Sequence, residues 1–358
     1  MRLAYERFYT TNLVKISRRR DCRRNLVNKR KHCKPLSAEQ RSEILAYWAP
    51  FANVKPHLAW FEFYSSACDD NSQLKYYIPD PVHFSEIDTF FTSPRISEAM
   101  DDKNLYDLYF HDVKTPLTIM RKINGELLDK EYHAITREQA LDLYAQAGNV
   151  LSKAARMSFG GHSIKFFDVE SCPKEEFSRY LDQVDHIVIQ EVISQHETLN
   201  RIHKASINTI RIMSLTLDGT TQVLSSVLRM GQHGARVDNA SSGGIVCGIT
   251  SEGTLKEIAY DHNGNKFTGH PQSGPLKGIK IEGYDKCCEL VKQLAGRMCS
   301  ASRLISWDFA IDPAGEPILI EVNLSFGELD FHQLCNGPIF GERTSEILSR
   351  VFNKSDKE

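Results

Sequence analysis

Three side chains that carry oxygen ligands, Asp308, Glu321 and Asn323, lie near the C-terminal end of the sequence. They belong to the stretch LISWDFAIDPAGEPILIEVNLSF (residues 304–326), in which the turn sequence DPAG joins two apolar, alternating runs. Side chains alternate across a strand, so a hairpin here places Asp308 opposite Glu321, with Asn323 one step further along the same face. Two carboxylates and an amide oxygen suit a hard divalent cation such as Mg²⁺. From this stretch alone, a surface hairpin with a polar outer face is an equal alternative.

The opposite face of this hairpin is expected to be apolar and to rest on the core. It would carry Trp307, Phe309, Ile311, Ile318, Ile320, Val322 and Leu324. Such a rigid apolar backing would hold the acidic face in place.

A lysine followed by a glycine pair is the second candidate for binding chemistry. Lys153 ends one expected strand, and Gly160 and Gly161 lie in the loop before the next strand, at residues 164–167. Glycine lets backbone N–H groups approach a phosphate closely, and a lysine at the base of the loop adds a positive charge for its oxygens. The stretch has neither the P-loop pattern nor the dinucleotide-binding glycine pattern, and an ordinary hairpin turn is the alternative interpretation.

An apolar strand expected at residues 186–193 runs into the polar segment SQHE. A purine needs an apolar slot and hydrogen bonds at its edge. Gln190 or Glu191 could reach an exocyclic amine, and the backbone near Ile193 could bond the ring edge. Glu197, a few residues on, could accept hydrogen bonds from ribose hydroxyls. Taken alone, this segment also fits a buried strand with a polar exit.

Three arginines, Arg211, Arg229 and Arg236, flank strands that lead toward the segment DNASSGG at residues 238–244. The fixed donor fork of a guanidinium group suits carboxylate and phosphate oxygens. An enzyme that makes an acyl phosphate needs such groups for the γ-phosphoryl group and for the acceptor carboxylate. Each arginine alone also fits a surface or ion-pair role. The sequence contains no G-x-S-x-G and no H-E-x-x-H, which argues against covalent and zinc mechanisms.

The composition is that of an ordinary globular protein. The 358 residues are 41% hydrophobic and 25% charged, enough for a sizeable core in two or three lobes. No apolar run approaches the roughly 18 residues of a membrane span, and the N-terminus has no apolar segment typical of a secretory signal. Nine cysteines without a C-x-x-C pair argue against a zinc site or a disulfide framework, and indicate reduced thiols in a cytoplasm.

Basic residues concentrate at the N-terminus. Residues 1–35 contain twelve Lys or Arg and two acidic residues, whereas the remainder contains 32 basic and 44 acidic residues. Such an arm can meet nucleic acid or an anionic membrane surface. It can also be a solvated helix or dock on its own acidic body, which we favour because no aromatic interleaving or nucleic-acid motif accompanies it. No nucleic-acid partner is therefore expected.

The order of expected helices and strands indicates an α+β fold. Capping boxes at residues 37–40 and 136–139 begin helices that reach about Tyr47 and Ala147. Residues 51–100 are rich in aromatics and prolines and are expected to form short helices and loops. Further helices are expected in part of residues 1–35 and at residues 101–111, 174–183, 284–299 and 344–352. Strands dominate in between without regular alternation with helices, so mainly antiparallel sheets are expected.

Taken in order, these motifs resemble the ATP-grasp superfamily. The resemblance is closest to its sugar-transfer-associated branch, found among bacterial polysaccharide-biosynthesis proteins. The strongest match is W-D-F-A-I-D-x-x-G-x-P-I-L-I-E-V-N, in which Asp308, Glu321 and Asn323 have the spacing of the Mg²⁺ ligands of D-alanine–D-alanine-ligase-like members. The stretch GARVDNASSGG (residues 234–244) is similar to the G-x-x-x-x-N-x-x-x-G-G motif of glutamate-ligase-type members, and it singles out Asn239.

Other positions follow or depart from the family pattern. Lys153 before the glycine loop is similar to the ATP-binding lysine of the family's lid, and Lys103 resembles the other family lysine. The family's arginine near the glycine motif falls on Val237, one place after Arg236. Ser306 stands where D-alanine-type ligases place an arginine, so the resemblance leaves oxyanion stabilisation to Arg211 or Arg229.

The resemblance implies two α+β lobes that grip ATP between antiparallel sheets. It divides the chain into a basic N-terminal arm (1–35), a helical, aromatic-rich segment (36–115), a lid or small lobe (116–192) and a large catalytic lobe (193–358). Together with the residue patterns, it assigns three sets of site residues. They are the nucleotide-binding set Lys103, Lys153, Gly160, Gly161, Gln190, Glu191, Ile193 and Glu197, the metal set Asp308, Glu321 and Asn323, and the catalytic set Arg211, Arg229 and Asn239.

The implied activity is that of an ATP- and Mg²⁺-dependent carboxylate–amine ligase that works through an acyl phosphate, in bacterial cell-surface polysaccharide biosynthesis or modification. Its substrates would be a small carboxylate and an amine, such as an amino sugar or glycan precursor, in the cytoplasm. One alternative is an ATP-grasp phosphotransferase that phosphorylates a hydroxyl. The other is a non-catalytic nucleotide-binding protein whose basic arm at residues 1–35 binds an anionic partner or surface.

Overall fold

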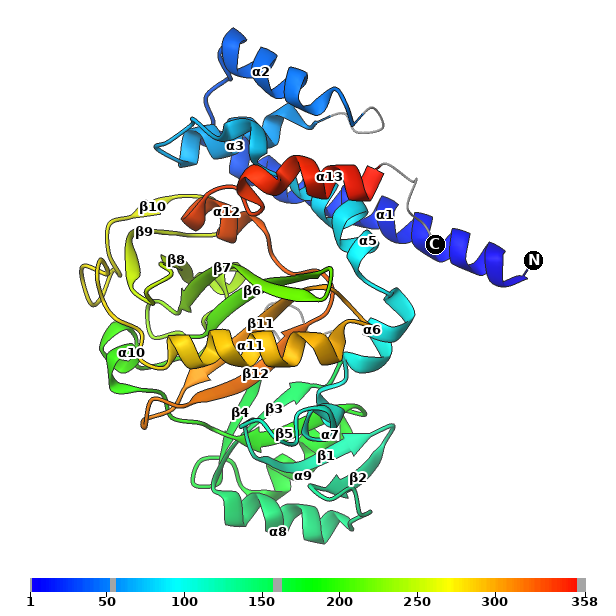
Figure 1. The fold of residues 1–358 in the computed structure, drawn as a ribbon. Helices are drawn as coiled ribbons and strands as arrows, with labels where there is room; N and C mark the ends of the chain where they lie inside the picture. The colour runs from blue at the N-terminus through cyan, green and yellow to red at the C-terminus, as the bar shows by residue number, and fades with distance from the viewer. Residues whose placement is uncertain (1, 52–55, 157–162, 353–358) are drawn as a thin grey trace.

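The computed structural model describes residues 2–51, 56–156 and 163–352, with the side chains from Lys15 onward except His32. Figure 1 shows three parts, with the N-terminal helices on one side of a central seven-stranded sheet and a five-stranded sheet on the other. No helix among these residues is long and apolar enough to cross a membrane.

The five-stranded sheet has the strand order β2-β1-β5-β3-β4, and all its neighbours are antiparallel. Its strands are β1 (Thr118–Ile123), β2 (Glu126–Asp129), β3 (Asn149–Ala154), β4 (Lys165–Asp168) and β5 (Ile187–Glu191). Two helices, α8 (Arg137–Ala147) and α9 (Lys174–Asp182), pack on it. Tyr144 of α8 stacks on Phe177 of α9 with ring centroids 4.0 Å apart, at the centre of this small core.

The seven-stranded sheet has the order β10-β9-β8-β7-β6-β11-β12 and is also fully antiparallel. Its strands are β6 (Ile210–Leu217), β7 (Thr220–Met230), β8 (Ile245–Ile249), β9 (Leu255–Tyr260), β10 (Lys266–Phe267), β11 (Leu304–Ile311) and β12 (Pro317–Asn323). Helices α10 (Glu197–Ile202) and α11 (Tyr284–Met298) cover one face, and α12 (Asp330–Asn336) and α13 (Thr344–Phe352) pack on the other.

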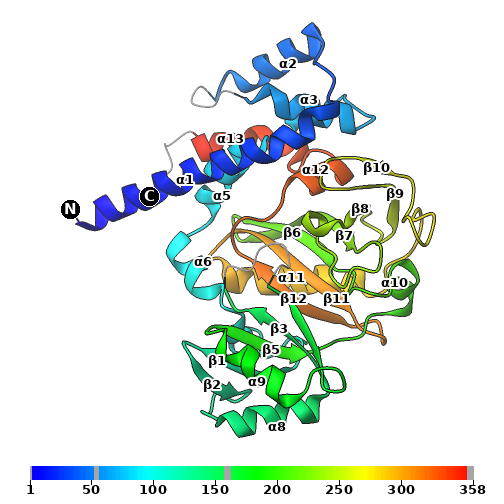
Figure 2. The ribbon, with the colours of Figure 1, turned by 180° about the vertical axis from the view of Figure 1, so that it is seen from behind.

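The N-terminal part is a long helix followed by several short ones, and those up to α5 pack on the face that bears α12 and α13 (Figure 2). They are α1 (Arg2–Lys29), α2 (Ala38–Trp48), α3 (Leu58–Ala67), α4 (Asp80–Val82), α5 (Asp88–Phe91), α6 (Pro94–Met100) and α7 (Tyr106–Tyr109), with a π-helical turn at His83–Ile87. Met100 of α6 and Tyr106 of α7 instead join the core on the side of α11. Buried aromatic rings hold these short helices together, among them Trp48, Trp60, Phe61 and Tyr64.

The α+β prediction and both capping boxes are confirmed. Ser37 and Thr136 each accept a hydrogen bond from the backbone N–H three residues on, at the starts of α2 and α8. The single helix expected at residues 101–111 is wrong, because the chain forms a 3₁₀ turn at Lys103–Leu105 and then the short α7. The Asp102 side chain caps this turn by accepting a hydrogen bond from the Asn104 N–H at 3.0 Å.

Candidate functional site

The C-terminal hairpin forms as predicted, with one shift in register. Asp308 of β11 pairs with Glu321 of β12, and Ser306 pairs with Asn323. Beyond Asp308 the register shifts, so Phe309 lies opposite Leu319. Leu319 is therefore fully buried, and Ile320, predicted on the apolar face, is only half-buried. A β-bulge adds one residue to one strand, which a strict alternation of side chains cannot anticipate.

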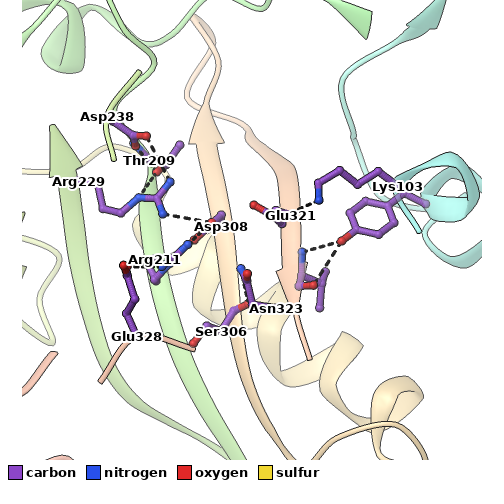
Figure 3. A network of polar contacts seen from close by, with 12 residues as sticks. Lys103, Thr209, Arg211, Arg229, Asp238, Ser306, Asp308, Glu321, Asn323 and Glu328 are labelled. Atoms are coloured by element: carbon purple, nitrogen blue, oxygen red, sulfur yellow. Dashed lines mark hydrogen bonds and ion pairs between the residues drawn. The ribbon is translucent and has the colours of Figure 1, made fainter. Parts of the chain in front are cut away.

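Asp308 is held by two arginines from neighbouring strands (Figure 3). Its carboxylate is 1% exposed and accepts hydrogen bonds from Arg211 Nε and Nη2, both at 2.7 Å. Arg229 Nη1 lies 3.6 Å from Asp308 Oδ2. Burial alone would raise the pKa of the Asp308 carboxyl, but the two guanidinium groups outweigh it and hold the pKa below its usual value. Asp308 is therefore a buried carboxylate that stays ionised.

Each arginine also has a second acidic partner. Arg211 Nη1 donates to Glu328, just beyond β12, at 2.6 Å. Arg229 Nη2 donates to Asp238 at 3.2 Å. Asp238 also accepts a hydrogen bond from the Thr209 N–H at 3.0 Å and one from the Thr209 hydroxyl. These contacts fix both guanidinium groups on the same face of the sheet as Asp308.

Lys103 comes from the 3₁₀ turn before α7 and forms an ion pair with Glu321 at 2.7 Å. Burial would lower the pKa of Lys103, but Glu321 and nearby acidic groups raise it above the usual value. Asp102 holds the turn in place, because its carboxylate lies 2.9 Å from both Arg156 Nε and His186 Nε2 at the ends of β3 and β5. The turn thus carries a charged lysine from outside the large sheet onto its acidic face.

Lys153 lies in β3 of the five-stranded sheet and is buried. Its ammonium group has no hydrogen-bonding partner among the described residues. Burial lowers the pKa of Lys153 to about 8, and the positive charge of Lys103 contributes. A buried lysine without a partner is poised to accept an anionic ligand.

The residues predicted for a purine lie around the end of β5. Gln190 is buried and donates from Nε2 to Pro116 O at 3.4 Å, while its Oε1 has no partner among the described residues. That oxygen is free to accept a bond from an exocyclic amine. The Glu191 carboxylate instead accepts a hydrogen bond from the Leu117 N–H at 3.0 Å, so it is engaged by β1. Ile193 is half-buried, and Glu197 is exposed at the start of α10.

Two predicted residues, Gly160 and Gly161, lie outside the described residues. Asn239 precedes a 3₁₀ turn at Ala240–Ser242, and its side chain forms no hydrogen bond with this turn. Its backbone carbonyl accepts hydrogen bonds from two N–H groups of the loop. The neighbouring Arg236 places its guanidinium 3.8 Å from the centre of the Phe166 ring, and so links the large lobe to β4.

Four residues of the site were not predicted: Asp238, Thr209, Glu328 and Tyr106. Asp238 immediately precedes the asparagine of the glycine motif, so a signal existed for it. The Tyr106 hydroxyl lies 3.3 Å from Val322 O and accepts a hydrogen bond from the Val322 N–H at 3.1 Å. It thereby supports β12 between Glu321 and Asn323, a contact between distant segments that no local pattern indicates.

The donor set of the hairpin fits a hard divalent cation. Asp308 and Glu321 come from paired positions, and each carboxylate oxygen can accept more than one bond, so the arginine and lysine contacts leave lone pairs available. Asn323 donates from Nδ2 to Ser306 O at 3.5 Å, which leaves its amide oxygen as a ligand. No cluster of three or more His, Cys, Asp or Glu suited to a metal occurs among the described residues, so the amide is needed as the third ligand.

Comparison with known families identifies the domain around this site. Residues 176–348, just under half of the chain, match the family model described as sugar-transfer associated ATP-grasp. Over this stretch the chain is similar to the sugar-transfer associated ATP-grasp family. The match includes Asp308, Glu321 and Asn323 and both arginines, whereas Lys103 and Lys153 lie before it. No curated protein sequence matches the chain.

Solved structures resemble the chain distantly. The ATP-grasp ligase PsnB, complexed with a minimal precursor, has a TM-score of 0.42 at 14% identity over 73% of this chain. D-alanyl-alanine synthetase A from Vibrio cholerae has a TM-score of 0.43 at 12% identity over 74% of this chain. The biotin carboxylase domain of the Hydrogenobacter thermophilus 2-oxoglutarate carboxylase has a TM-score of 0.46 at 14% identity over 74% of this chain. The matches span 64%, 68% and 48% of these chains, so the chain spans less than two thirds of PsnB.

Proposed function

We propose that the chain is an ATP- and Mg²⁺-dependent carboxylate–amine ligase that acts through an acyl phosphate. The observation that carries the proposal is the gathering of Asp308 and Glu321 with Lys103, Arg211 and Arg229 on one face of the large sheet. Phosphoryl transfer depends on positioned cations around the phosphate oxygens. The ATP-grasp domain match supports the same assignment.

The nucleotide would bind between the lobe at residues 116–192 and the lobe at residues 193–358. The adenine amine would donate to Gln190 Oε1, with the backbone near Ile193 at the ring edge and Glu197 at the ribose. Lys153 would contact the α- or β-phosphate, since its buried ammonium has no other partner among the described residues.

The phosphate tail would extend from Lys153 toward the hairpin. Mg²⁺ held by Asp308, Glu321 and Asn323 would offset the negative charge of the β- and γ-phosphates. Arg211 and Arg229 would contact the γ-phosphoryl group and the substrate carboxylate through the guanidinium N–H groups that their acidic partners leave free. Asn239, next to Asp238 in the loop at residues 234–244, would line the same end of the site.

The reaction would take place in two balanced steps. An oxygen of the substrate carboxylate attacks the γ-phosphorus, the bond to ADP breaks, and ADP leaves with the electron pair. The amine then attacks the acyl carbon, phosphate leaves with the electrons of the C–O bond, and the amine proton passes to a base. The arginines would stabilise the oxygens on which charge develops in each step.

The biological setting that we propose is a cytoplasmic step in bacterial cell-surface polysaccharide biosynthesis or modification. The proposal rests on the sugar-transfer association of the matched family. The substrates would be a small carboxylate and an amine such as an amino sugar or another glycan precursor. A phosphotransferase would use the same nucleotide residues, so the experiment below separates the two reactions.

The test incubates the purified chain with Mg²⁺-ATP and a panel of carboxylates, with hydroxylamine as the trapping amine. A ligase is expected to release ADP and form a hydroxamate with its own carboxylate, because hydroxylamine intercepts an acyl phosphate. ADP release with a stable phosphorylated alcohol and no hydroxamate would establish the phosphotransferase instead. Failure to bind Mg²⁺-ATP at all would overturn both and leave a non-catalytic role.

Lys153 predicts a specific pH dependence of nucleotide affinity. A phosphate partner raises the pKa of a lysine, so the contribution of Lys153 to affinity is fully present below the free value of about 8 and is lost above it, as pH rises through the raised pKa of the bound state. We expect the affinity for a non-hydrolysable Mg²⁺-ATP analogue to fall from pH 7 to 9, with proton uptake on binding near pH 8, measured by calorimetry in buffers of different ionisation enthalpy. Lys153→Arg should bind with little change over this range. An equal fall in wild type and variant would contradict the role of Lys153.

A further inference from the structure

The long helix α1 has two different faces. Its inner face is bound to the body through Lys15, Arg18, Cys22 and Lys29, whose spacings of three, four and seven residues place them on one side of a helix. Arg18 donates to Asp88 and to Phe84 O, both at 2.6 Å, and its guanidinium lies 3.7 Å from the centre of the Phe326 ring. This face confirms that the basic arm docks on its own body.

The outer face continues into the turn that follows α1, and we call it the outer stripe. It consists of Ile16, Arg20, Arg23, Arg24, Val27 and Lys31, all of them exposed. Their spacing of three or four residues places them along one side of the helix, opposite the docked side chains. Figure 2 shows α1 lying in front of α13 at the surface, with its N-terminal part extending beyond the body.

The charges of the outer stripe are barely compensated. Arg24 lies 3.6 Å from Asp21, a pair in which both side chains are well exposed. Arg20, Arg23 and Lys31 form no ion pair among the described residues. The nearby carboxylates are already paired: Glu86, Asp88 and Asp330 with the inner face, and Glu62 with Arg30. The stripe therefore presents a row of cations to whatever approaches it.

Two aliphatic side chains accompany these cations. Ile16 is 62% exposed and Val27 is 66% exposed, the highest values among the large hydrophobic residues of the described chain. They lie at either end of the arginine group on the same side of the helix. The two aliphatic side chains argue against nucleic acid, because its phosphate backbone offers them no apolar partner. The arginines argue against a second copy of the stripe, because the two copies would bring arginine against arginine.

We infer that the outer stripe of α1 binds an anionic phospholipid surface. The arginines would contact headgroup phosphates, and Ile16 and Val27 would enter the interface between headgroups and acyl chains. The docked inner face would hold the helix flat, so the body would lie against the membrane from one defined side. The inference is independent of the reaction at the hairpin and requires no membrane-spanning segment.

The test measures co-sedimentation of the full chain with vesicles of phosphatidylcholine, alone or with about 30% phosphatidylglycerol. We expect binding only to the anionic vesicles, weakened by salt. Arg20→Glu with Arg23→Glu should lower this binding at least about tenfold. Ile16→Ser with Val27→Ser should also weaken it, because the apolar contribution is lost.

The matched control reverses two exposed charges on α11, Lys286→Glu with Lys292→Glu, which gives the same change in net charge on the other face of the large sheet. This control should bind anionic vesicles as wild type does, and thermal unfolding should confirm that all variants are folded. An equal loss in the control, or no binding to anionic vesicles, would overturn the inference. Binding of RNA that Arg20→Glu with Arg23→Glu abolishes, without any vesicle binding, would assign the stripe to nucleic acid.

Discussion

Replacing Asp308 by Asn is expected to lower the rate of ATP turnover by about a thousandfold or more, and to destabilise the protein. The carboxylate is the point where the proposed metal ligands and both arginines meet, and groups that stabilise developing charge contribute several kcal/mol to a transition state. Removing its charge also leaves two buried guanidinium groups with one partner fewer. Such a loss costs roughly 3–5 kcal/mol. Arg211 still has its ion pair with Glu328 in the variant, and Arg229 still has its ion pair with Asp238. We therefore expect a loss of stability near the lower end of this range.

The matched control is Asp312→Asn, which makes the same chemical change four residues further along the hairpin. Asp312 caps the turn by accepting hydrogen bonds from the Ala314 and Glu316 N–H groups, and forms an ion pair with the exposed Lys114. The Asp312→Asn variant should release ADP in the presence of Mg²⁺ at a rate close to that of wild type. The assay compares both variants at a temperature where urea unfolding shows them folded. Wild-type turnover in Asp308→Asn would refute the proposed site.

The hairpin could be predicted because its information is local. Alternation of side chains and one turn sequence are sufficient to place Asp308 opposite Glu321, and the structure has this register. The bulge that turns Ile320 away from the core depends on how two strands twist together, which no residue in the stretch specifies. The same limit explains why one face of the ribbon was predicted correctly and the other only in part.

Other contacts of the site join segments that are far apart in sequence. Lys103 meets Glu321 only because Asp102 ties its turn to Arg156 and His186, and each of these residues lies in a different part of the chain. Local patterns give helix starts and strand faces, but not which surface packs on which. The family resemblance singled out Lys103, and the structure supplies its partner. The roles of these residues remain predictions.

Replacing Lys29 by Met is expected to destabilise the protein by about 3–5 kcal/mol, because it leaves a buried carboxylate without its counter-charge. Lys29 Nζ donates to Asp330 at 2.7 Å and to His262 O at 2.6 Å, and both side chains of the ion pair are less than a tenth exposed. Asp80 is buried in the same place, and burial together with Asp330 raises its pKa, so Asp330 is the carboxylate that depends on Lys29. Urea unfolding at neutral pH measures the loss.

The pH dependence of this loss separates a missing charge from a missing contact. Burial alone would raise the pKa of Asp330, and Lys29 lowers it below the usual value, so wild-type Asp330 stabilises the fold above its unfolded pKa of about 4 and loses this effect as pH falls. In Lys29→Met burial loses its largest opposing charge, so the pKa of Asp330 rises, and the deficit in unfolding free energy should shrink as pH falls toward 4. Adding Asp330→Asn to Lys29→Met should recover most of the stability at neutral pH. The control is Arg24→Met, which breaks the exposed pair with Asp21 and should cause no measurable loss of stability. A deficit that is constant with pH would mean that Lys29 contributes packing rather than charge, and that α1 is anchored by its apolar contacts.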